Sequence, residues 1–182
     1  TRESNLKCDF EKGVTIEFWL KNDTLDTNTK QALFHLTNSS GGDELTLYLS
    51  GTSGSPFFTT LSASHSAIFG NQRIGTTPDT SSIANWNHYA VSFKSASAGI
   101  TTKFYLNGTL DQTTNLGTVG TNTLTQAETV AYLASGSHGD EHLYFSGSMD
   151  EFRFWKTERS AQDIGRNWFG QVRGGSNTDI SN

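Results

Sequence analysis

The chain has 182 residues, of which 34% are hydrophobic, 12% aromatic and 17% charged, and its formal net charge at pH 7 is −5. This length suits a single domain that can bury a hydrophobic core, and the aromatic content excludes a disordered chain. The acidic balance and the lack of a lysine or arginine cluster argue against nucleic acid as a partner, and no apolar run is long enough to insert into a membrane.

Short segments in which apolar and polar residues alternate predict most of the secondary structure. Segment 14–21 places Ile16 and Phe18 on one face and Glu17 and Trp19 on the other, as in a strand with one buried side. The same alternation predicts further strands at 32–36, 45–49, 89–93, 104–106, 130–134 and 152–155. Seven apolar residues of these strands should meet in the core: Ile16, Phe18, Val91, Phe93, Leu106, Phe152 and Phe154.

The connections carry recognisable turn and cap residues. Segment 107–108, Asn-Gly, suits a tight type I′ hairpin turn, in which both residues need positive φ. Segment 160–163, Ser-Ala-Gln-Asp, is typical of a capping box and should open one short helix. Segments 62–85 and 110–128 are long and weakly patterned, and Trp86 is expected to fill one end of the core. Many strands with one late helix and no strand–helix alternation indicate an all-β sandwich or barrel.

Three segments occur in an order that is typical of one family. They are 15–21, Thr-Ile-Glu-Phe-Trp-Leu-Lys; 86–93, Trp-Asn-His-Tyr-Ala-Val-Ser-Phe, with 103–108; and 145–155, which ends in Met-Asp-Glu-Phe-Arg-Phe-Trp, followed by 159–164. Together they resemble the laminin-G-like jelly-roll domain of the concanavalin A-like lectin/glucanase superfamily. The resemblance implies an all-β fold, an antiparallel two-sheet jelly-roll sandwich with one short C-terminal helix. We expect this domain to span residues 1–170, followed by a polar tail or linker at 171–182.

Calcium is the cofactor that the resemblance suggests, because many relatives hold one Ca²⁺ at an edge of the sandwich. Ca²⁺ prefers oxygen ligands on irregular loops. Alternation places Asp150 at the start of the last strand on its inward side, where a carboxylate must be paired, hydrogen-bonded or metal-bound. We therefore predict Asp150 as a ligand, joined by Asp9 and Glu11 if the N-terminal segment runs alongside. The alternative is that Asp150 accepts hydrogen bonds from backbone amides and Asp9 is merely exposed.

A sugar-binding surface needs exposed aromatic rings beside hydrogen-bonding side chains. By alternation Tyr48, Tyr105 and Tyr144 lie on faces opposite the clearest core residues, so we predict them as ligand contacts. The alternative for each tyrosine is ordinary packing. His138 and Asp140 belong to a glycine-containing segment that we expect to be a solvated loop rather than a metal site, and we predict both as further ligand contacts on the binding rim.

Catalysis is not expected. Retaining glucanases of the superfamily that the chain resembles place two carboxylates on one strand face with the pattern Glu-x-Asp-x-x-Glu, which is absent here. Asp150 and Glu151 are adjacent and should point to opposite faces. The single cysteine, Cys8, has no nearby base and is expected to be inert.

The sequence therefore predicts a non-catalytic recognition module that binds a glycan or a protein surface. Domains that resemble it occur in large extracellular, cell-surface and phage virion proteins, so an adhesin or a virion protein is the expected parent. One alternative is a structural or decoration domain that associates with its own copies in an assembly. A glycoside hydrolase-like enzyme is a second, less favoured alternative.

Overall fold

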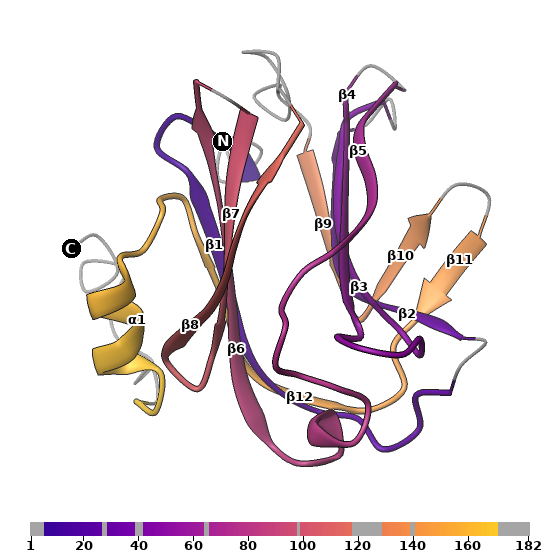
Figure 1. Ribbon diagram of the computed structural model, residues 1–182. Coiled ribbons are helices and arrows are strands. Elements are labelled where there is room, and N and C mark those ends of the chain that lie inside the picture. The colour runs from indigo at the N-terminus through magenta and orange to yellow at the C-terminus, as the bar shows by residue number, and fades with distance from the viewer. Residues whose placement is uncertain are drawn as a thin grey trace.

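The computed structural model describes residues 6–26, 29–38, 42–63, 66–97, 99–117, 129–138 and 141–170. These residues form two five-stranded antiparallel sheets that face one another, as the jelly-roll prediction requires (Figure 1). Within these ranges no helix is both long and apolar enough to cross a membrane. The predicted polar tail, 171–182, lies outside the described residues.

One sheet carries a helix on its outer face, and we call it the helix-side sheet. Its strands in spatial order are β12 (Ser148–Trp155), β1 (Val14–Lys21), β6 (Asn87–Ala96), β7 (Gly99–Leu106) and β8 (Thr109–Leu116). The helix is α1 (Ala161–Asn167).

The other sheet carries a two-stranded hairpin outside it, and we call it the hairpin-side sheet (Figure 1). Its strands in spatial order are β5 (Ser66–Arg73), β4 (Phe57–Ala63), β3 (Glu44–Ser50), β2 (Lys30–Asn38) and β9 (Thr129–Leu133). The hairpin consists of β10 (Ser135–His138) and β11 (Glu141–Tyr144). A short 3-10 turn, η2 (Ser82–Ala84), lies before β6.

The core between the sheets contains the residues that alternation selected. All seven predicted side chains pack in one cluster, with the four from β1 and β6 fully buried and the three from β7 and β12 partly buried. Phe57 of β4 crosses the gap between the sheets, since its ring centroid lies 4.5 Å from that of Tyr89 on β6 and 5.1 Å from that of Phe104 on β7. Burial of these rings is the main favourable contribution to folding.

The predicted hairpin turn and helix cap are both confirmed. Asn107 and Gly108 have φ of 48° and 78°, as a type I′ turn requires. Ser160 Oγ accepts the N–H of Asp163 at 3.1 Å and donates to the Asp163 carboxylate at 2.6 Å, so this pair caps the first turn of α1.

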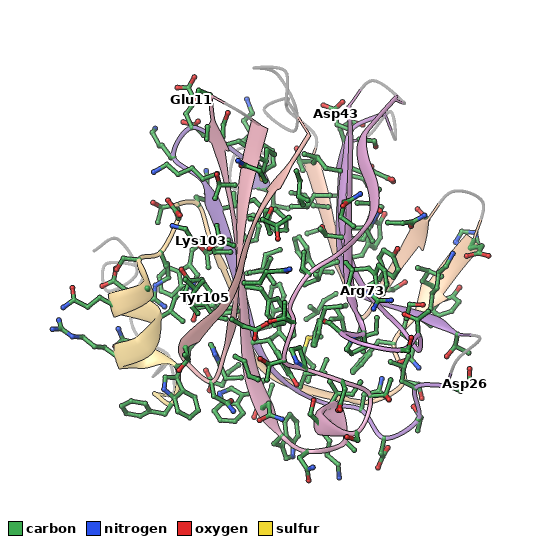
Figure 2. All side chains as sticks on the ribbon, viewed as in Figure 1. Glu11, Asp26, Asp43, Arg73, Lys103 and Tyr105 are labelled. Atoms are coloured by element: carbon green, nitrogen blue, oxygen red, sulfur yellow. The ribbon has the colours of Figure 1, made fainter. Side chains whose placement is uncertain are left out.

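Helix α1 covers part of the outer face of the helix-side sheet. Its buried residue Ile164 packs with Ala90 and Tyr105, and Figure 2 shows Tyr105 on the α1 side of the sheet. The indole of Trp168 lies against the hairpin turn at Gly108, where a Cβ atom would come within 2.2 Å of the ring. Glycine is therefore needed at this turn for two reasons, its positive φ and the close approach of the indole.

Five strands were not predicted from the alternation of apolar residues: β4, β5, β8, β10 and β11. β5 and β8 lie in the two weakly patterned segments, and β8 reads Thr-Leu-Asp-Gln-Thr-Thr-Asn-Leu. β10 and β11 lie where we expected a loop, and His138 pairs there with Glu141. β8 and β10 are held by backbone ladders to their neighbours and bury few apolar side chains, which leaves no period-two signal to detect.

Candidate functional site

A groove runs between the β10–β11 hairpin and the outer face of the hairpin-side sheet, and we call it the hairpin groove. Its volume is about 460 Å³, within the range of roughly 300–1,000 Å³ typical of ligand pockets. Residues from β2, β3, β9 and the hairpin line it: His35, Thr37, Asn38, Glu44, Val130, Tyr132, Ser135, Gly136, Ser137 and His142.

The hairpin is seated on the sheet by two close contacts. Gly136 lies so near β2 that a Cβ atom on it would come within 2.7 Å of the His35 side chain. Leu143 is buried against Ala32 and Tyr48. These contacts fix the distance between hairpin and sheet, and hence the width of the groove.

Strand register places several polar side chains on one face of the hairpin. Ser135 pairs with Tyr144, and Ser137 pairs with His142, so these four side chains share a face. Three of them line the groove. Tyr144 is 68% exposed, and its register places it beside them.

The floor of the groove is polar and contains a buried, hydrogen-bonded histidine. His35 is buried on β2, and its Nδ1 lies 2.8 Å from the hydroxyl of Thr46. Burial lowers the pKa of His35, which favours the neutral imidazole, and burial raises the pKa of Glu44. The ring of Tyr132 lies 5.9 Å from that of His35 and is 47% exposed, so an aromatic face borders the hydrogen-bonding floor.

Two predicted ligand contacts are wrong. Tyr48 is buried beneath the hairpin, and its hydroxyl donates to Asn71 Oδ1 at 2.6 Å. Tyr105 is buried beneath α1. Both point away from the core as predicted, but the hairpin and the helix cover the outer faces, and alternation within a strand carries no information about such a second layer.

The other predicted contacts belong to the hairpin. Tyr144 is exposed on β11, and its contact with a ligand stays a prediction. His138 ends β10, and its side chain is not described; Asp140 lies outside the described residues. The position of this segment at a binding rim stays a prediction.

The predicted calcium ligands do not come together. Asp150 is exposed and pairs in register with Trp19, whereas Asp9 lies in the turn before Val14, at the start of β1. At about 3.3 Å per residue, roughly 16 Å of strand separates Val14 from Trp19. Within the part of the chain that the structure describes, no three His, Cys, Asp or Glu side chains could hold one ion. These donors do not fit a calcium ion, and calcium elsewhere on the chain stays a prediction.

Of the other two predicted calcium ligands, Asp9 stabilises a turn and Glu11 is exposed. Asp9 accepts the N–H of Glu11 at 3.0 Å and forms an ion pair with Lys12 at 3.4 Å, so it closes its own turn. Glu11 is exposed at the end of the sandwich in Figure 2.

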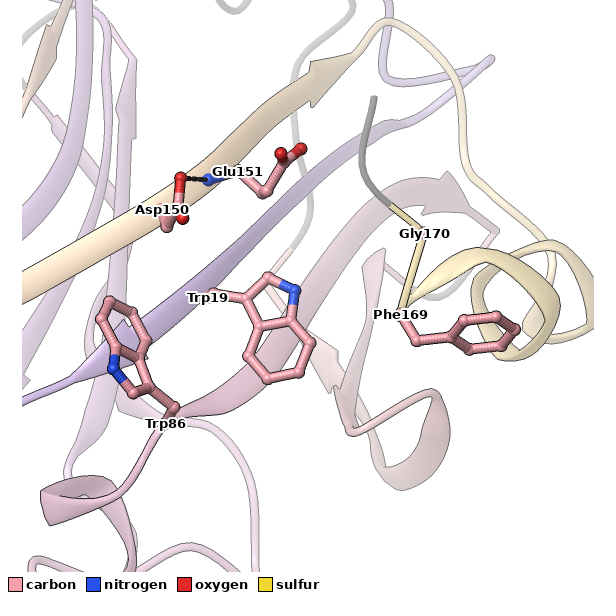
Figure 3. A pocket seen from close by; sticks show the side chains of 6 residues that line it. All are labelled: Trp19, Trp86, Asp150, Glu151, Phe169 and Gly170. Atoms are coloured by element: carbon pink, nitrogen blue, oxygen red, sulfur yellow. Dashed lines mark hydrogen bonds between the residues drawn. The ribbon is translucent and has the colours of Figure 1, made fainter. Parts of the chain in front are cut away.

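A β-bulge in β12 reverses the predicted direction of Asp150. Glu151 has φ of 48°, and the register of β12 against β1 shifts between Glu17 and Trp19. An extra residue at a bulge interrupts alternation. Asp150 therefore points to the outer face of the sheet, beside its cross-strand neighbour Trp19. It lines the same pocket as Glu151, although the two side chains were predicted to point to opposite faces (Figure 3).

This second hollow, which we call the aromatic pocket, lies on the outer face of the helix-side sheet. Its volume is about 260 Å³. The predicted packing role of Trp86 is wrong, because its side chain is 47% exposed at this pocket. The pocket is lined by Trp19, Trp86, Asp150, Glu151, Phe169 and Gly170 (Figure 3).

A buried ion cluster next to the aromatic pocket was not predicted as a unit. Glu17 is fully buried, and its Oε1 accepts from Arg159 Nη1 at 2.7 Å. Its Oε2 lies 3.6 Å from His88 Nε2 and 3.9 Å from Arg153 Nη1. The Arg159 guanidinium also stacks on Trp155, 4.5 Å from the ring centroid. Since Glu17 and His88 are inaccessible, the cluster fastens the segment before α1 to the sheet rather than binding a ligand.

A laminin G family model, described as the concanavalin A-like lectin/glucanases superfamily, matches residues 3–165. The chain belongs to this superfamily. No curated protein matches its sequence.

Several solved structures share the fold of this superfamily member at low sequence identity. The native heptameric SAP-like pentraxin from Limulus polyphemus is 14% identical, with a TM-score of 0.54 over 85% of this chain and 68% of its own. The CBM40 of Ruminococcus gnavus IT-sialidase, bound to alpha2,3 sialyllactose, is 15% identical, with a TM-score of 0.57 over 86% of this chain and 83% of its own. Botulinum neurotoxin type C, whose cell entry is dependent upon interaction with two ganglioside molecules, is 15% identical, with a TM-score of 0.54 over 85% of this chain and 35% of its own.

The single thiol of this laminin-G-like domain should be unreactive in the folded state. Cys8 is buried, and burial raises the pKa of its thiol to about 12, although the nearby charge of Lys156 acts in the opposite direction. The thiolate is the reactive form, and almost none is present at pH 8. Ellman's reagent should therefore label the native protein negligibly and label one thiol per chain in guanidinium chloride. Rapid stoichiometric labelling of the native protein would contradict the buried position of Cys8.

Proposed function

We propose that this domain is a non-catalytic recognition module that binds a glycan in the hairpin groove. The observation that carries the proposal is the pairing of an exposed aromatic ring, Tyr132, with hydrogen-bonding groups along the groove. An aromatic face can pack on the apolar side of a sugar ring, while imidazole and hydroxyl groups such as those of His142 and Ser137 can bond its hydroxyls. The groove volume suits one or a few sugar rings.

Two further observations support this proposal. Solved proteins with the same fold include one bound to sialyllactose and one whose cell entry depends on gangliosides. The sequence lacks the Glu-x-Asp-x-x-Glu pattern, which supports recognition without hydrolysis. By the same reasoning we propose that the parent protein acts outside the cell, on a cell surface or in a virion.

A glycan array tests the proposal directly. The array should include sialylated and neutral glycans and should be run once with calcium and once with a chelator, because calcium is a separate prediction for this chain. Saturable binding to a defined glycan class is expected. The absence of binding to a broad array under both conditions would refute a glycan as the ligand.

Substitution of groove residues should weaken glycan binding without unfolding the protein. Tyr132→Ala should cost about 1–2 kcal/mol of binding free energy, which is roughly a 5- to 30-fold increase in Kd, because Tyr132 is the large aromatic ring of the groove. Leu110→Ser is the matched control, since Leu110 is 46% exposed on the other sheet. Isothermal titration with the best glycan measures both variants. Equal affinity of the Tyr132 variant and the parent would place the glycan elsewhere.

One observation favours the assembly alternative. Val130 and Leu133 are 44% and 49% exposed on β9, which lies at the end of the hairpin-side sheet. Exposed apolar residues on such a strand can pair with a second copy. Light scattering across a concentration series tests this: a monomer at all concentrations contradicts an assembly role, and a dimer that Leu133→Lys abolishes supports it.

A further inference from the structure

The aromatic pocket lies on the opposite outer face from the hairpin groove and has a different composition. Its walls come from β1, the segment before β6, the bulge of β12 and the segment after α1 (Figure 3). At about 260 Å³ it is smaller than most pockets for oligosaccharides or drug-sized ligands. A single side chain or small ion is the size of ligand that it fits.

Aromatic rings remain at the surface of this pocket instead of packing in the core. Trp86 is 47% exposed and Phe169 is 67% exposed. Trp19 is held in place by Trp168 and His88, whose ring centroids lie 5.6 Å and 5.9 Å away. Two indoles and a phenyl ring at one hollow form an apolar surface that a flat ligand could cover.

Two carboxylates share the same hollow. The bulge turns Glu151 toward the side of Asp150, and Asp150 Oδ1 accepts the N–H of Glu151 at 2.7 Å. Arg153 Nη2 lies 3.1 Å from Glu151 Oε2 and also donates to the carbonyl of Gly170, so it fixes one wall of the pocket. Across the described ranges, no lysine, arginine or histidine forms an ion pair with Asp150. The nearby Lys21 pairs instead with Asp23, at 4.0 Å.

The same sheet face already binds one guanidinium with an indole ring and a carboxylate. Arg159 stacks on the face of Trp155 while it donates to the buried Glu17 carboxylate at 2.7 Å. An indole face and a carboxylate together satisfy the flat, apolar faces and the charged edge of a guanidinium. The aromatic pocket repeats these two groups at the surface, with Trp86 and Asp150 in the corresponding roles.

We infer that the aromatic pocket binds the guanidinium of an arginine side chain presented by a partner protein. The indole of Trp86 lies against the guanidinium plane, and the carboxylate of Asp150 accepts its N–H groups. A neutral side chain of the same shape lacks the charge that both groups recognise, and the Asp150 carboxylate repels an anion because, across the described ranges, no cationic side chain forms an ion pair with it. The inference does not depend on glycan binding, because the hairpin groove lies on the other sheet.

The test compares a charged probe with its neutral isostere. N-acetyl-arginine amide and N-acetyl-citrulline amide have the same shape, and only the first is charged. Two-dimensional NMR of the full chain monitors the four tryptophan indole N–H signals during titration. We expect saturable shifts of the Trp86 and Trp19 signals with the arginine probe and at least about tenfold weaker binding of the citrulline probe.

Matched variants separate binding from folding. Trp86→Leu keeps an apolar side chain but removes the π face, and Asp150→Asn keeps the shape but removes the charge; each should weaken arginine binding about tenfold. Glu141→Gln removes an exposed carboxylate from the other face of the molecule and should leave arginine binding unchanged. An unchanged circular dichroism spectrum verifies that each variant is folded. Equal binding of arginine and citrulline, or no saturable shift with either, would overturn the inference, whatever the glycan array shows.

Discussion

Replacing Glu17 with glutamine should lower the free energy of unfolding at pH 7 by about 3 kcal/mol. Breaking a buried ion pair from one side typically costs 3–5 kcal/mol, because the remaining charge is left buried without its partner. The lower end is expected here because Arg159 also donates to the carbonyl of Asp163 and Arg153 also pairs with Glu151. Urea denaturation measures the change as a shift of the midpoint with an unchanged slope.

The size of this effect should depend on pH in a defined direction. Burial alone would raise the pKa of Glu17, but the contacts with His88 and Arg159 outweigh it, so its pKa lies below the ordinary value of 4.5. The unfolded chain therefore takes up a proton at higher pH than the folded chain does. The stabilisation by Glu17 is full above about pH 4.5 and is lost as the pH falls through the lower, folded-state pKa.

A control variant distinguishes the buried ion cluster from surface charges. Asp9→Asn removes an exposed carboxylate whose ion pair with Lys12 is screened by solvent, so this variant should unfold at nearly the same urea concentration as the parent. A Glu17→Gln variant as stable as the parent at pH 7, or a stability difference that grows in acid, would contradict the assigned role of the cluster.

Replacing Phe57 with alanine should lower the free energy of unfolding by about 3–5 kcal/mol. Its side chain is fully buried and joins the two sheets through Tyr89 and Phe104. The loss of its ring would leave a cavity at the centre of the sandwich. At about 2–4 °C per kcal/mol for a chain of this size, the melting temperature should fall by roughly 6–20 °C in calorimetry.

The adjacent residue is a matched control. Phe58 points to the outer face of β4, where it is half-buried, stacks on Tyr48 with ring centroids 5.5 Å apart, and lies under the Arg73 guanidinium. Phe58→Ala should therefore destabilise the protein much less than Phe57→Ala. Similar costs for both variants would mean that the two faces of β4 do not differ as the structure shows.

The sequence predicted those elements whose burial produces a regular pattern. β1 begins and ends where the alternation does, at Val14 and Lys21, and the turn at 107–108 and the capped start of α1 followed from local chemistry. The polar strands β8 and β10 were missed because backbone pairing rather than side-chain burial holds them.

The candidate sites were less predictable, because they depend on how the hairpin, the helix and the loops pack on the outer faces of the two sheets. Alternation correctly turned Tyr48 and Tyr105 away from the core, but the covering hairpin and helix are tertiary features. The direction of Asp150 was wrong because a one-residue bulge at Glu151 has no signature in the sequence. The aromatic pocket combines four distant segments, which only the folded chain brings together.

The ion pair between Arg159 and Glu17 joins residues 142 positions apart and so sets an order of events during synthesis. At about 5–20 residues per second, a ribosome makes Arg159 about 7–28 s after Glu17. Strand β12, which covers the free edge of β1, also arrives late. In the nascent chain, the Glu17 side chain on β1 therefore stays uncovered until these late residues are made. The helix-side sheet can be completed only when nearly all of the domain has been translated.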